Sequence, residues 1–440
     1  MDRRQETLLE TDVLVVGGGA AGVACAAVAA RGGRKVVVVE RYGFCGGGAV
    51  AGLSGTICGL YAASDRKNSP PEQVVHGFVD EFIGLLEQRG GVTAPVQYGK
   101  TYTRVHDPLV WREAADHLLG EEANVQVIFH ATVVGTLCEG NRVVGVRAFT
   151  KQGPLRIMAK VVVDASGDAD VAAMAGRPLT KGKDGQIQNP TMIFRLSGVD
   201  VPRFLSVAGA DSILDTTISD LIISLHRSGE YNLPRAKIFL FPTPRPGELL
   251  CNATRIVGRD GRELDATQFV DLAEAEVMGR RQVREYARFL VNHLPGCENA
   301  FVNDTGTQVG IRQTWQIVGK DRLTNDAVTS ARKRSDGICR SPWPIELHSG
   351  EKPKLHWILD DYYEVPFGCF VPSEGTGLLV AGRCLSAEHE AMASARVTAQ
   401  CFGYGQAIGI AADAMCDDPG RQLSGSDIRA ALNAAGAQLD

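Results

Sequence analysis

Three glycines near the start of the chain have the spacing of a phosphate-binding turn. Gly17, Gly19 and Gly22 form the pattern Gly-x-Gly-x-x-Gly. In this pattern the first glycine permits a tight turn, the second leaves room for a pyrophosphate, and the third lets a helix pack closely on a strand. Glu40 follows at the place where a carboxylate can bind ribose hydroxyls. These residue types, in this order, predict dinucleotide binding.

A second glycine cluster distinguishes between the possible dinucleotides. Gly46, Gly47 and Gly48 follow the acidic residue directly, and a long irregular stretch comes after them. A nicotinamide-binding fold would continue with further strand–helix repeats instead. Bare backbone at this position suits a larger cofactor, whose pyrophosphate and ribityl chain pass over the loop. The second cluster therefore predicts FAD.

The elements that must position these glycines can be recognised from hydrophobic pattern. Residues 11–16 and 34–40 are apolar runs typical of buried strands, and an alanine-rich helix between them ends at Gly32-Gly33. This strand–helix–strand unit puts the first glycine cluster at the N-terminus of the helix, where backbone amides favour phosphate. Two further helices are predicted at 71–91 and at 107–122, the second capped by Asp107.

The middle of the chain has a different pattern. Turn residues separate three β-rich runs, which predict a three-stranded meander over residues 125–137, 141–150 and 154–166. From about residue 190 the strands become longer, at 191–200, 236–241, 249–257 and 306–319, with a helix within 266–293. A buried strand at 377–386 and a helix of small residues at 395–415 return to the first type.

These patterns predict an α/β fold with two domains. We expect a doubly wound, Rossmann-like FAD-binding domain with a β-meander, and an inserted α+β substrate domain. The FAD-binding domain is assigned residues 1–60, 100–190 and 355–440, and the substrate domain residues 61–99 and 190–355.

Composition and charge exclude several classes of function. The 440 residues are 44% hydrophobic and 22% charged, with a net charge of −5, which predicts no nucleic-acid partner and no membrane patch. No apolar run approaches the roughly 20 residues of a membrane span. The eleven cysteines include no Cys-x-x-Cys pair, so we expect no metal site. An odd number of thiols without a secretory leader predicts a cytoplasmic protein, and the sequence leaves open a homo-oligomer.

Longer stretches resemble a known family. The segment "DVLVVGGGAAGVACAAVAARGGRKVVVVERYGFCGGGAVAG" resembles the N-terminal signature of the glutathione-reductase-like flavoproteins, and within them the family known as FAD-dependent oxidoreductases. "VVVDASGDADVAAMAG", "NPTMIFRLSGVD", "VGIRQTWQIVGKDRLT" and "LLVAGRCLSAEHEAMASARVTAQCFGYGQAIGIAA" match further family blocks, so the resemblance spans residues 11 to about 415. Two departures are the replacement of a charged Glu-Ser-Arg-Arg by Gln-Thr-Trp-Gln at 313–316 and Cys45 at a usually aliphatic place.

The resemblance implies a set of cofactor contacts. Asp168 and the Ala-Gly-Arg at 381–383 are expected at the ribityl and pyrophosphate groups, with a turn-capping aspartate as the alternative for Asp168. The helix at 395–415 is expected to point its N-terminus at the flavin ring. With the glycine clusters, the expected cofactor-binding residues are Gly17, Gly19, Ala20, Ala21, Gly22, Glu40, Arg41, Cys45, Gly46, Gly47, Gly48, Val133, Ala165, Gly167, Asp168, Gly382, Arg383, Arg396 and Val397.

Candidate catalytic residues come from the same blocks. His389 is the first candidate for a general base or substrate anchor, with a structural histidine as the alternative. Arg312 could bind an anionic substrate group bidentately or form an internal ion pair. His348 matches a family position expected to line the same cavity. Cys45 could tether the flavin covalently, although a buried cysteine is more often a small hydrophobe.

The resulting prediction is an FAD-dependent oxidoreductase. The expected reaction oxidises a small polar metabolite by hydride transfer to flavin N5. Two alternatives remain open. The flavin could act in the other direction, in a reductase or monooxygenase, or the protein could be a non-catalytic electron-carrier subunit.

Overall fold

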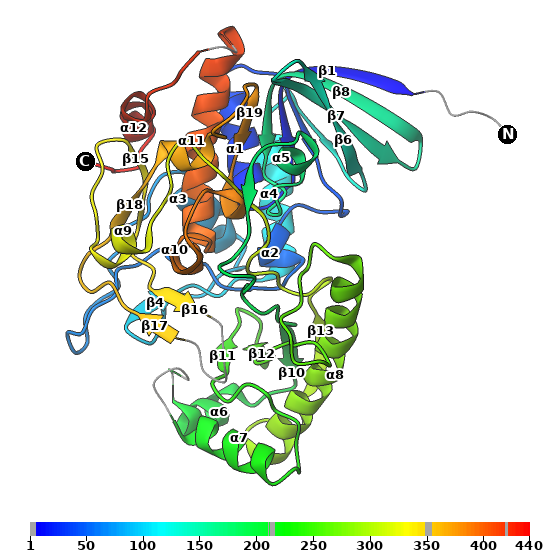
Figure 1. Ribbon diagram of the computed structural model, residues 1–440. Coiled ribbons are helices and arrows are strands. Elements are labelled where there is room, and N and C mark those ends of the chain that lie inside the picture. Colours follow the sequence, from blue (N-terminus) through cyan, green and yellow to red (C-terminus); the bar gives the residue numbers. More distant parts are fainter. Residues whose placement is uncertain (1–5, 210, 212–215, 348–353, 419–420) are drawn as a thin grey trace, which may run out of the picture.

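The fold is built on a seven-stranded sheet (Figure 1). The computed structural model describes residues 6–209, 211, 216–347, 354–418 and 421–440. The strand order is β5-β2-β1-β8-β7-β6, and β19 also pairs with β8. The parallel part of this sheet consists of β1 (Thr7–Val16), β2 (Val36–Val39), β5 (Val125–Ile128), β8 (Gly153–Asp164) and β19 (Leu378–Val380). Its inner strands are valine-rich because both faces are covered.

The meander begins later than the sequence indicated. Residues 125–137 were expected to form one strand, but the chain turns at His130, whose φ is +52°. The first part becomes β5, which pairs in parallel with β2, and only the second part enters the meander. The antiparallel meander is β6 (Thr132–Glu139), β7 (Arg142–Thr150) and the first half of β8.

Small residues let two helices lie unusually close on the sheet. Helix α1 (Ala20–Arg31) packs along α11 (Thr398–Asp417). A Cβ on Gly405 would lie 2.2 Å from the Ala21 carbonyl oxygen, and one on Gly409 would lie 2.8 Å from that of Cys25. The alanine and glycine content of both helices therefore reflects backbone-to-backbone contact. None of the described helices combines the length and apolar character needed to cross a bilayer.

Helices α3 (Phe78–Gln88) and α4 (Pro108–Gly120) complete this layer. The predicted cap of α4 is confirmed, because the Asp107 carboxylate accepts a hydrogen bond from the Leu109 amide at 2.7 Å. The predicted start of α3 near residue 71 is wrong. Gly77, with φ +99°, sets the start of the helix, and its amide donates to the Asp80 carboxylate at 2.9 Å.

A second sheet lies beyond the first, in the lower part of Figure 1. It is antiparallel, in the order β11 (Phe239–Pro242), β12 (Glu248–Asn252), β10 (Phe194–Ser197) and β13 (Phe301–Thr305). Helices α6 (Val201–Ala208), α7 (Thr217–Arg227) and α8 (Phe269–His293) accompany it. Its hydrophobic cluster draws on residues 192–309 and is separate from the larger cluster around the first sheet.

The predicted division into domains stays a prediction, and the packing does not follow its boundaries everywhere. Apolar side chains of α3 and of residues 317–345 belong to the larger cluster around the first sheet. The strand predicted at 306–319 is wrong over most of its length, since only β14 (Gln316–Ile317) is a strand, paired with β9 (Leu179–Thr180). Arg312 therefore lies in an extended loop.

The remaining elements are short. They are α2 (Gly47–Val50), β3 (Val96–Tyr98), β4 (Thr101–Thr103), α5 (Asp170–Met174), α9 (Asn325–Thr329), β15 (Gly337–Ser341), β16 (Ile345–Leu347), β17 (Lys354–His356), β18 (Tyr363–Pro366), two 3-10 turns at Phe367–Phe370 and Gly382–Cys384, α10 (His389–Ala395) and α12 (Gly425–Ala434).

A buried histidine gives the fold a testable pH dependence. The His106 ring lies against that of Trp111, with centroids 4.4 Å apart, and neither of its nitrogens has a hydrogen-bond partner. Burial lowers the pKa of His106 to about 4. Between its unfolded value of 6.5 and this value, the unfolded chain binds a proton at His106 that the folded chain does not. The stability associated with neutral His106 is thus complete above pH 6.5 and decreases as the pH falls toward 4.

Between neutral and acidic pH, protonation of His106 should lower the free energy of unfolding of the wild type by about 3 kcal/mol. We expect this contribution to be missing in His106→Phe. Urea unfolding of the wild type and the variant over this pH range measures the difference. His117→Gln, at an exposed position of α4, serves as the control and should leave the pH dependence unchanged. Parallel curves for the wild type and His106→Phe would contradict the buried neutral state.

Candidate cofactor and substrate site

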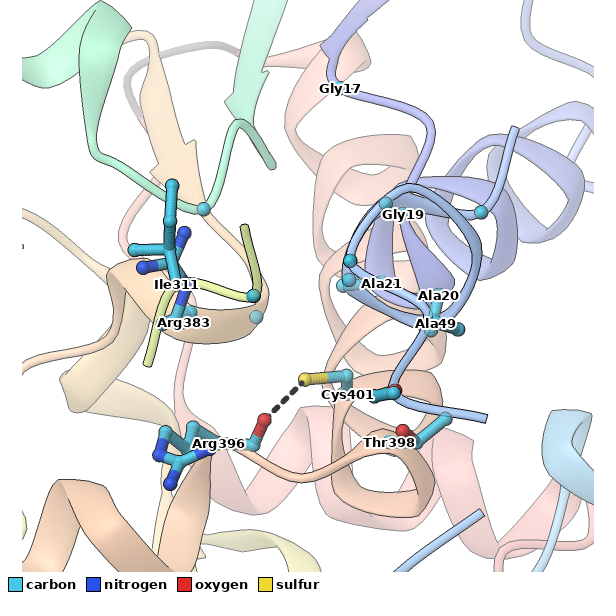
Figure 2. Close-up of a pocket in the computed structure, with 18 of the residues that line it drawn as sticks. Gly17, Gly19, Ala20, Ala21, Ala49, Ile311, Arg383, Arg396, Thr398 and Cys401 are labelled. Atoms are coloured by element: carbon cyan, nitrogen blue, oxygen red, sulfur yellow. Dashed lines mark hydrogen bonds between the residues drawn. The ribbon is translucent and has the colours of Figure 1, made fainter. Parts of the chain in front are cut away.

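A cavity of about 340 Å³ lies at the carboxyl ends of the parallel strands. Val16, Ala165 and Ala381, which directly end or follow β1, β8 and β19, line it. In open parallel sheets ligands bind at this edge. Figure 2 shows Gly19 and Ala21 on one side of the cavity and Arg383 on the other. The sheet thus brings an N-terminal segment and a segment from the C-terminal part of the chain to one site.

The three motif glycines have different physical reasons for lacking a side chain. Gly17 has φ +102°, and a Cβ there would lie 2.4 Å from the Ala165 carbonyl oxygen. A Cβ on Gly22 would lie 1.9 Å from the Gly17 carbonyl oxygen. For Gly19 the nearest atom, the Gly47 Cα, is 3.8 Å away, which is an ordinary contact. The fold itself requires Gly17 and Gly22, whereas the space at Gly19 is left for a ligand.

The second glycine cluster lies directly against the first. The Gly46 amide donates to the Gly18 carbonyl at 2.8 Å, and a Cβ on Gly47 would lie 2.9 Å from the Gly19 Cα. A Cβ on Gly48 would meet no atom within 4 Å. Gly46, Gly47 and Gly48 all line the cavity. Two bare loops therefore form one cradle, which is the space that a pyrophosphate and ribityl chain require.

Glu40 fixes the backbone of this cradle through hydrogen bonds to two amides. Its carboxylate accepts hydrogen bonds from the Gly18 amide at 2.6 Å and the Tyr42 amide at 2.9 Å. Burial raises the pKa of Glu40. Cys45 does not line the cavity but packs against Gly18, where a Cβ would lie 2.6 Å from its Sγ. Burial raises the pKa of the Cys45 thiol, so the geometry supports a small packed hydrophobe rather than a covalent tether.

Three aspartates, one just before the Ser-Gly-Asp-Ala-Asp turn and two within it, have different roles. Asp164, buried at the end of β8, accepts from the Val171 and Ala172 amides at 2.9 and 3.0 Å and so fixes the turn. Asp168 pairs with Arg383 and accepts from the Thr314 hydroxyl, both at 2.8 Å. Asp170 faces the cavity instead, and burial together with repulsion from Asp168 raises its pKa to about 6. The sequence pointed to Asp168 and missed Asp170.

The helix expected at 395–415 is broken where it reaches the cavity. Helix α10 ends at Ala395, and α11 begins at Thr398, so Arg396 and Val397 form the junction. Figure 2 shows Arg396, Thr398 and Cys401 together at the cavity. The Cys401 thiol donates to the Arg396 carbonyl at 3.6 Å. The N-terminus of α11, three residues later than predicted, is therefore part of the lining.

The structure brings most predicted cofactor residues to the cavity. The lining includes Gly17, Gly19, Ala20, Ala21, Glu40, Arg41, Gly46, Gly47, Gly48, Val133, Ala165, Gly167, Gly382, Arg383, Arg396 and Val397. Gly22, Cys45 and Asp168 lie behind it. Their individual contacts with the cofactor stay predictions.

The catalytic candidates differ in whether they line the cavity. Arg312 lines the cavity, while His389 does not. His389 is buried at the start of α10, its Nδ1 has no hydrogen-bond partner, and burial lowers its pKa. General-base catalysis by His389 stays a prediction, and its position outside the cavity lining does not support it. His348 lies outside the described residues.

The end of the cavity toward the second sheet was not foreseen. Tyr98, Phe241, Trp343 and Glu346 line it together with Arg312. They come from β3, β11, β16 and the segment before β16, and only the sheet packing brings them together. The Tyr98 hydroxyl donates to Glu346 at 2.9 Å. No motif links these residues in the sequence, so no local signal could have identified them.

Parallel strands that end on a glycine cradle define a dinucleotide-binding protein. A family model for FAD dependent oxidoreductases matches residues 12–432, and the chain belongs to this family. The cofactor is therefore FAD, and the protein is an FAD-dependent oxidoreductase. The cradle fits it, because no described residue fills the open space at Gly19 and Gly48.

Solved structures similar to the chain include flavoproteins and oxidoreductases by their names. A geranylgeranyl bacteriochlorophyll reductase-like protein from Thermoplasma acidophilum is similar with a TM-score of 0.50 and 13% identity, covering 97% of this chain and 83% of that chain. The p-nitrophenol 4-monooxygenase PnpA from Pseudomonas putida DLL-E4 has a TM-score of 0.44 and 13% identity, covering 72% and 70%. A comparison with curated proteins finds no match. At this identity the first likeness shows the fold alone.

We expect Gly19→Val to yield folded protein without FAD, because the branched side chain would fill the open space of the cradle. Flavin absorbance per protein and circular dichroism measure the two properties separately. Gly84→Val in α3 is the control and should keep its FAD, because a Cβ there meets no atom within 4 Å and the residue does not line the cavity. Full flavin content in Gly19→Val would exclude this loop as the phosphate site.

Proposed function

We propose that the protein oxidises a small polar metabolite at the end of the cavity formed by Tyr98, Phe241, Trp343, Glu346 and Arg312. The observation that carries this proposal is one continuous cavity, which runs from the glycine cradle to these side chains. When bound, FAD supplies a hydride acceptor at N5 of its ring. The chain itself must then bind and orient the metabolite and keep water away.

The described side chains can perform these tasks. Arg312 makes one hydrogen bond, from Nη1 to the Asn189 carbonyl at 2.6 Å, and forms no ion pair with any described residue. The alternative of an internal ion pair therefore has no support, and its guanidinium is available to orient a polar group. The rings of Tyr98, Phe241 and Trp343 are buried and shield that group from solvent. Glu346 and the Tyr98 hydroxyl offer a hydrogen-bonded pair at the same place.

The second sheet contributes residues to the cavity, as an inserted substrate domain would. Phe241 comes from β11, and Ile193, directly before β10, lines the cavity as well. The two parts of the lining are also joined directly, because the side chain of Gln308 accepts hydrogen bonds from Arg41 and Tyr42. We further propose that the chain is of the glutathione-reductase-like type, in which a domain of this kind covers the flavin.

A reductase or monooxygenase would use the same cavity with the opposite direction of electron flow. Anaerobic mixing with pools of small metabolites distinguishes these functions. We expect a metabolite to bleach the flavin without added nicotinamide, whereas a reductase or monooxygenase would stay yellow until NADH or NADPH is supplied. Bleaching by nicotinamide alone, with no response to any metabolite, would contradict the proposal.

We expect His389→Asn to reduce its flavin at the wild-type rate, because His389 lies outside the cavity lining. Stopped-flow absorbance under anaerobic conditions measures that rate across pH. A decrease of roughly 10²–10⁴-fold, the usual effect of losing a general base, would show that His389 reaches the substrate after all.

A further inference from the structure

Three arginines gather at the substrate end of the cavity, of which Arg235 and Arg312 are buried and Arg396 is half-buried. Arg312 and Arg396 line it, and Arg235 lies behind Asn252, to whose side-chain oxygen its Nη1 donates at 2.8 Å. None of the three forms an ion pair with a described residue. Arg396 donates only to the neutral Gln188 side chain, at 3.0 Å. Among the described residues at this end, Glu346 is the carboxylate that faces them.

The arginines are short of negative charge. Burial lowers the pKa of Arg312 well below its ordinary range, and repulsion from Arg396 and Arg235 lowers it further. Burial also lowers the pKa of Arg396, to about 10. A buried cation without a counter-ion destabilises a fold, so three cations around one carboxylate favour binding of an anion.

Unpaired hydrogen-bond donors indicate the same chemistry. Nε of Arg396 and Nε1 of Trp343 are buried and have no acceptor in the described part of the chain, and both residues line the cavity. Arg312 has five N–H donors, and one of them bonds the Asn189 carbonyl at 2.6 Å. A carboxylate accepts several hydrogen bonds and matches the planar guanidinium fork, whereas a hydroxyl or amine would leave most of these donors unpaired.

One wall of this end of the cavity is aromatic. The rings of Tyr98 and Phe241 are nearly parallel, with an interplanar angle of 14° and centroids 5.7 Å apart. The Trp343 ring lies 5.1 Å from that of Tyr98, measured between centroids, and is tilted by 47° against it. Ile193 extends this wall. A second carboxylate would lose its hydration against these rings without gaining a cation, so the wall favours one flat, uncharged body.

We infer that the substrate is a flat monocarboxylic acid, aromatic or conjugated, with its carboxylate on Arg312 and Arg396 and its body against Tyr98, Phe241 and Trp343. This inference rests on the proposed function, since it identifies the class of metabolite for the same site. It adds what that proposal left open, namely the charge, the number of carboxylates and the shape of the substrate.

Benzoate is a suitable probe, because its binding can be followed in the flavin absorption spectrum of the holoenzyme without turnover. We expect saturable binding that is roughly 10- to 100-fold tighter than that of neutral benzamide, the difference expected for hydrogen bonds to a charged group. Fumarate, which is flat but doubly charged, and cyclohexanecarboxylate, which is not flat, should both bind more weakly than benzoate. Equal affinity for benzamide, or tighter binding of fumarate, would overturn the inference.

Variants then locate the carboxylate. Arg312→Met should weaken benzoate binding by roughly 10- to 100-fold and Arg312→Lys by less, since lysine keeps the charge but loses the fork. Arg280→Met on the exposed side of α8 is the control and should bind as the wild type. FAD content reports whether each variant is folded. Should Arg312→Met fail to fold, Trp343→Phe keeps an aromatic side chain but removes the indole N–H, and it should weaken benzoate binding by roughly two- to tenfold.

The outcomes separate this inference from the proposed function. Benzoate binding that depends on Arg312, with no metabolite able to reduce the flavin, would support the carboxylate site and contradict the direction of the reaction. Reduction by a neutral metabolite, with benzoate binding unchanged in Arg312→Met and Trp343→Phe, would overturn the carboxylate site and leave the oxidation intact.

Discussion

The site depends on the backbone of a single residue, Gly18, which is held through both its amide and its carbonyl group. Its amide donates to the Glu40 carboxylate at 2.6 Å, and its carbonyl accepts from the Gly46 amide at 2.8 Å. A Cβ on Gly18 would also lie 2.6 Å from the Sγ of Cys45. These contacts join the first glycine turn, the end of β2 and the second glycine loop into one rigid unit. The cradle is therefore preorganised, because it requires no rearrangement of the backbone to leave space for phosphate groups.

The same contacts explain which parts of the site the sequence could predict. Gly17, Gly19, Gly22, Glu40 and the second glycine cluster interact within one strand–helix–strand unit, so their spacing in the chain already encodes their spacing in space. The errors occurred where a long-range contact decides the conformation. Residues 125–128 leave the meander because β2 offers a parallel partner, and the loop that carries Arg312 has no neighbouring strand over most of its length. Tyr98, Phe241, Trp343 and Glu346 meet only through the packing of two sheets.

Asp168 illustrates how a correct motif can lead to an incomplete assignment. The turn at 164–170 was recognised, and Asp168 was expected to face the cofactor. In the structure its carboxylate is already engaged by Arg383 and Thr314, so it orients Arg383 at the cavity wall. Asp170, two residues later, faces the cavity. Spacing along a tight turn identifies the group of residues that can reach a site, while the hydrogen bonds within the turn decide which one does.

Several arginines of this protein have carboxylates beside them. Arg195 pairs with Asp304 at 2.7 Å and Arg262 with Asp271 at 2.6 Å. Arg312 and Arg396 are more deeply buried than Arg262, yet neither has such a partner among the described residues. Stability alone would favour an apolar side chain or a nearby carboxylate at these positions. Cations that weaken the fold where they stand, next to a flavin cavity, are most simply explained by an anion that binds there during the reaction.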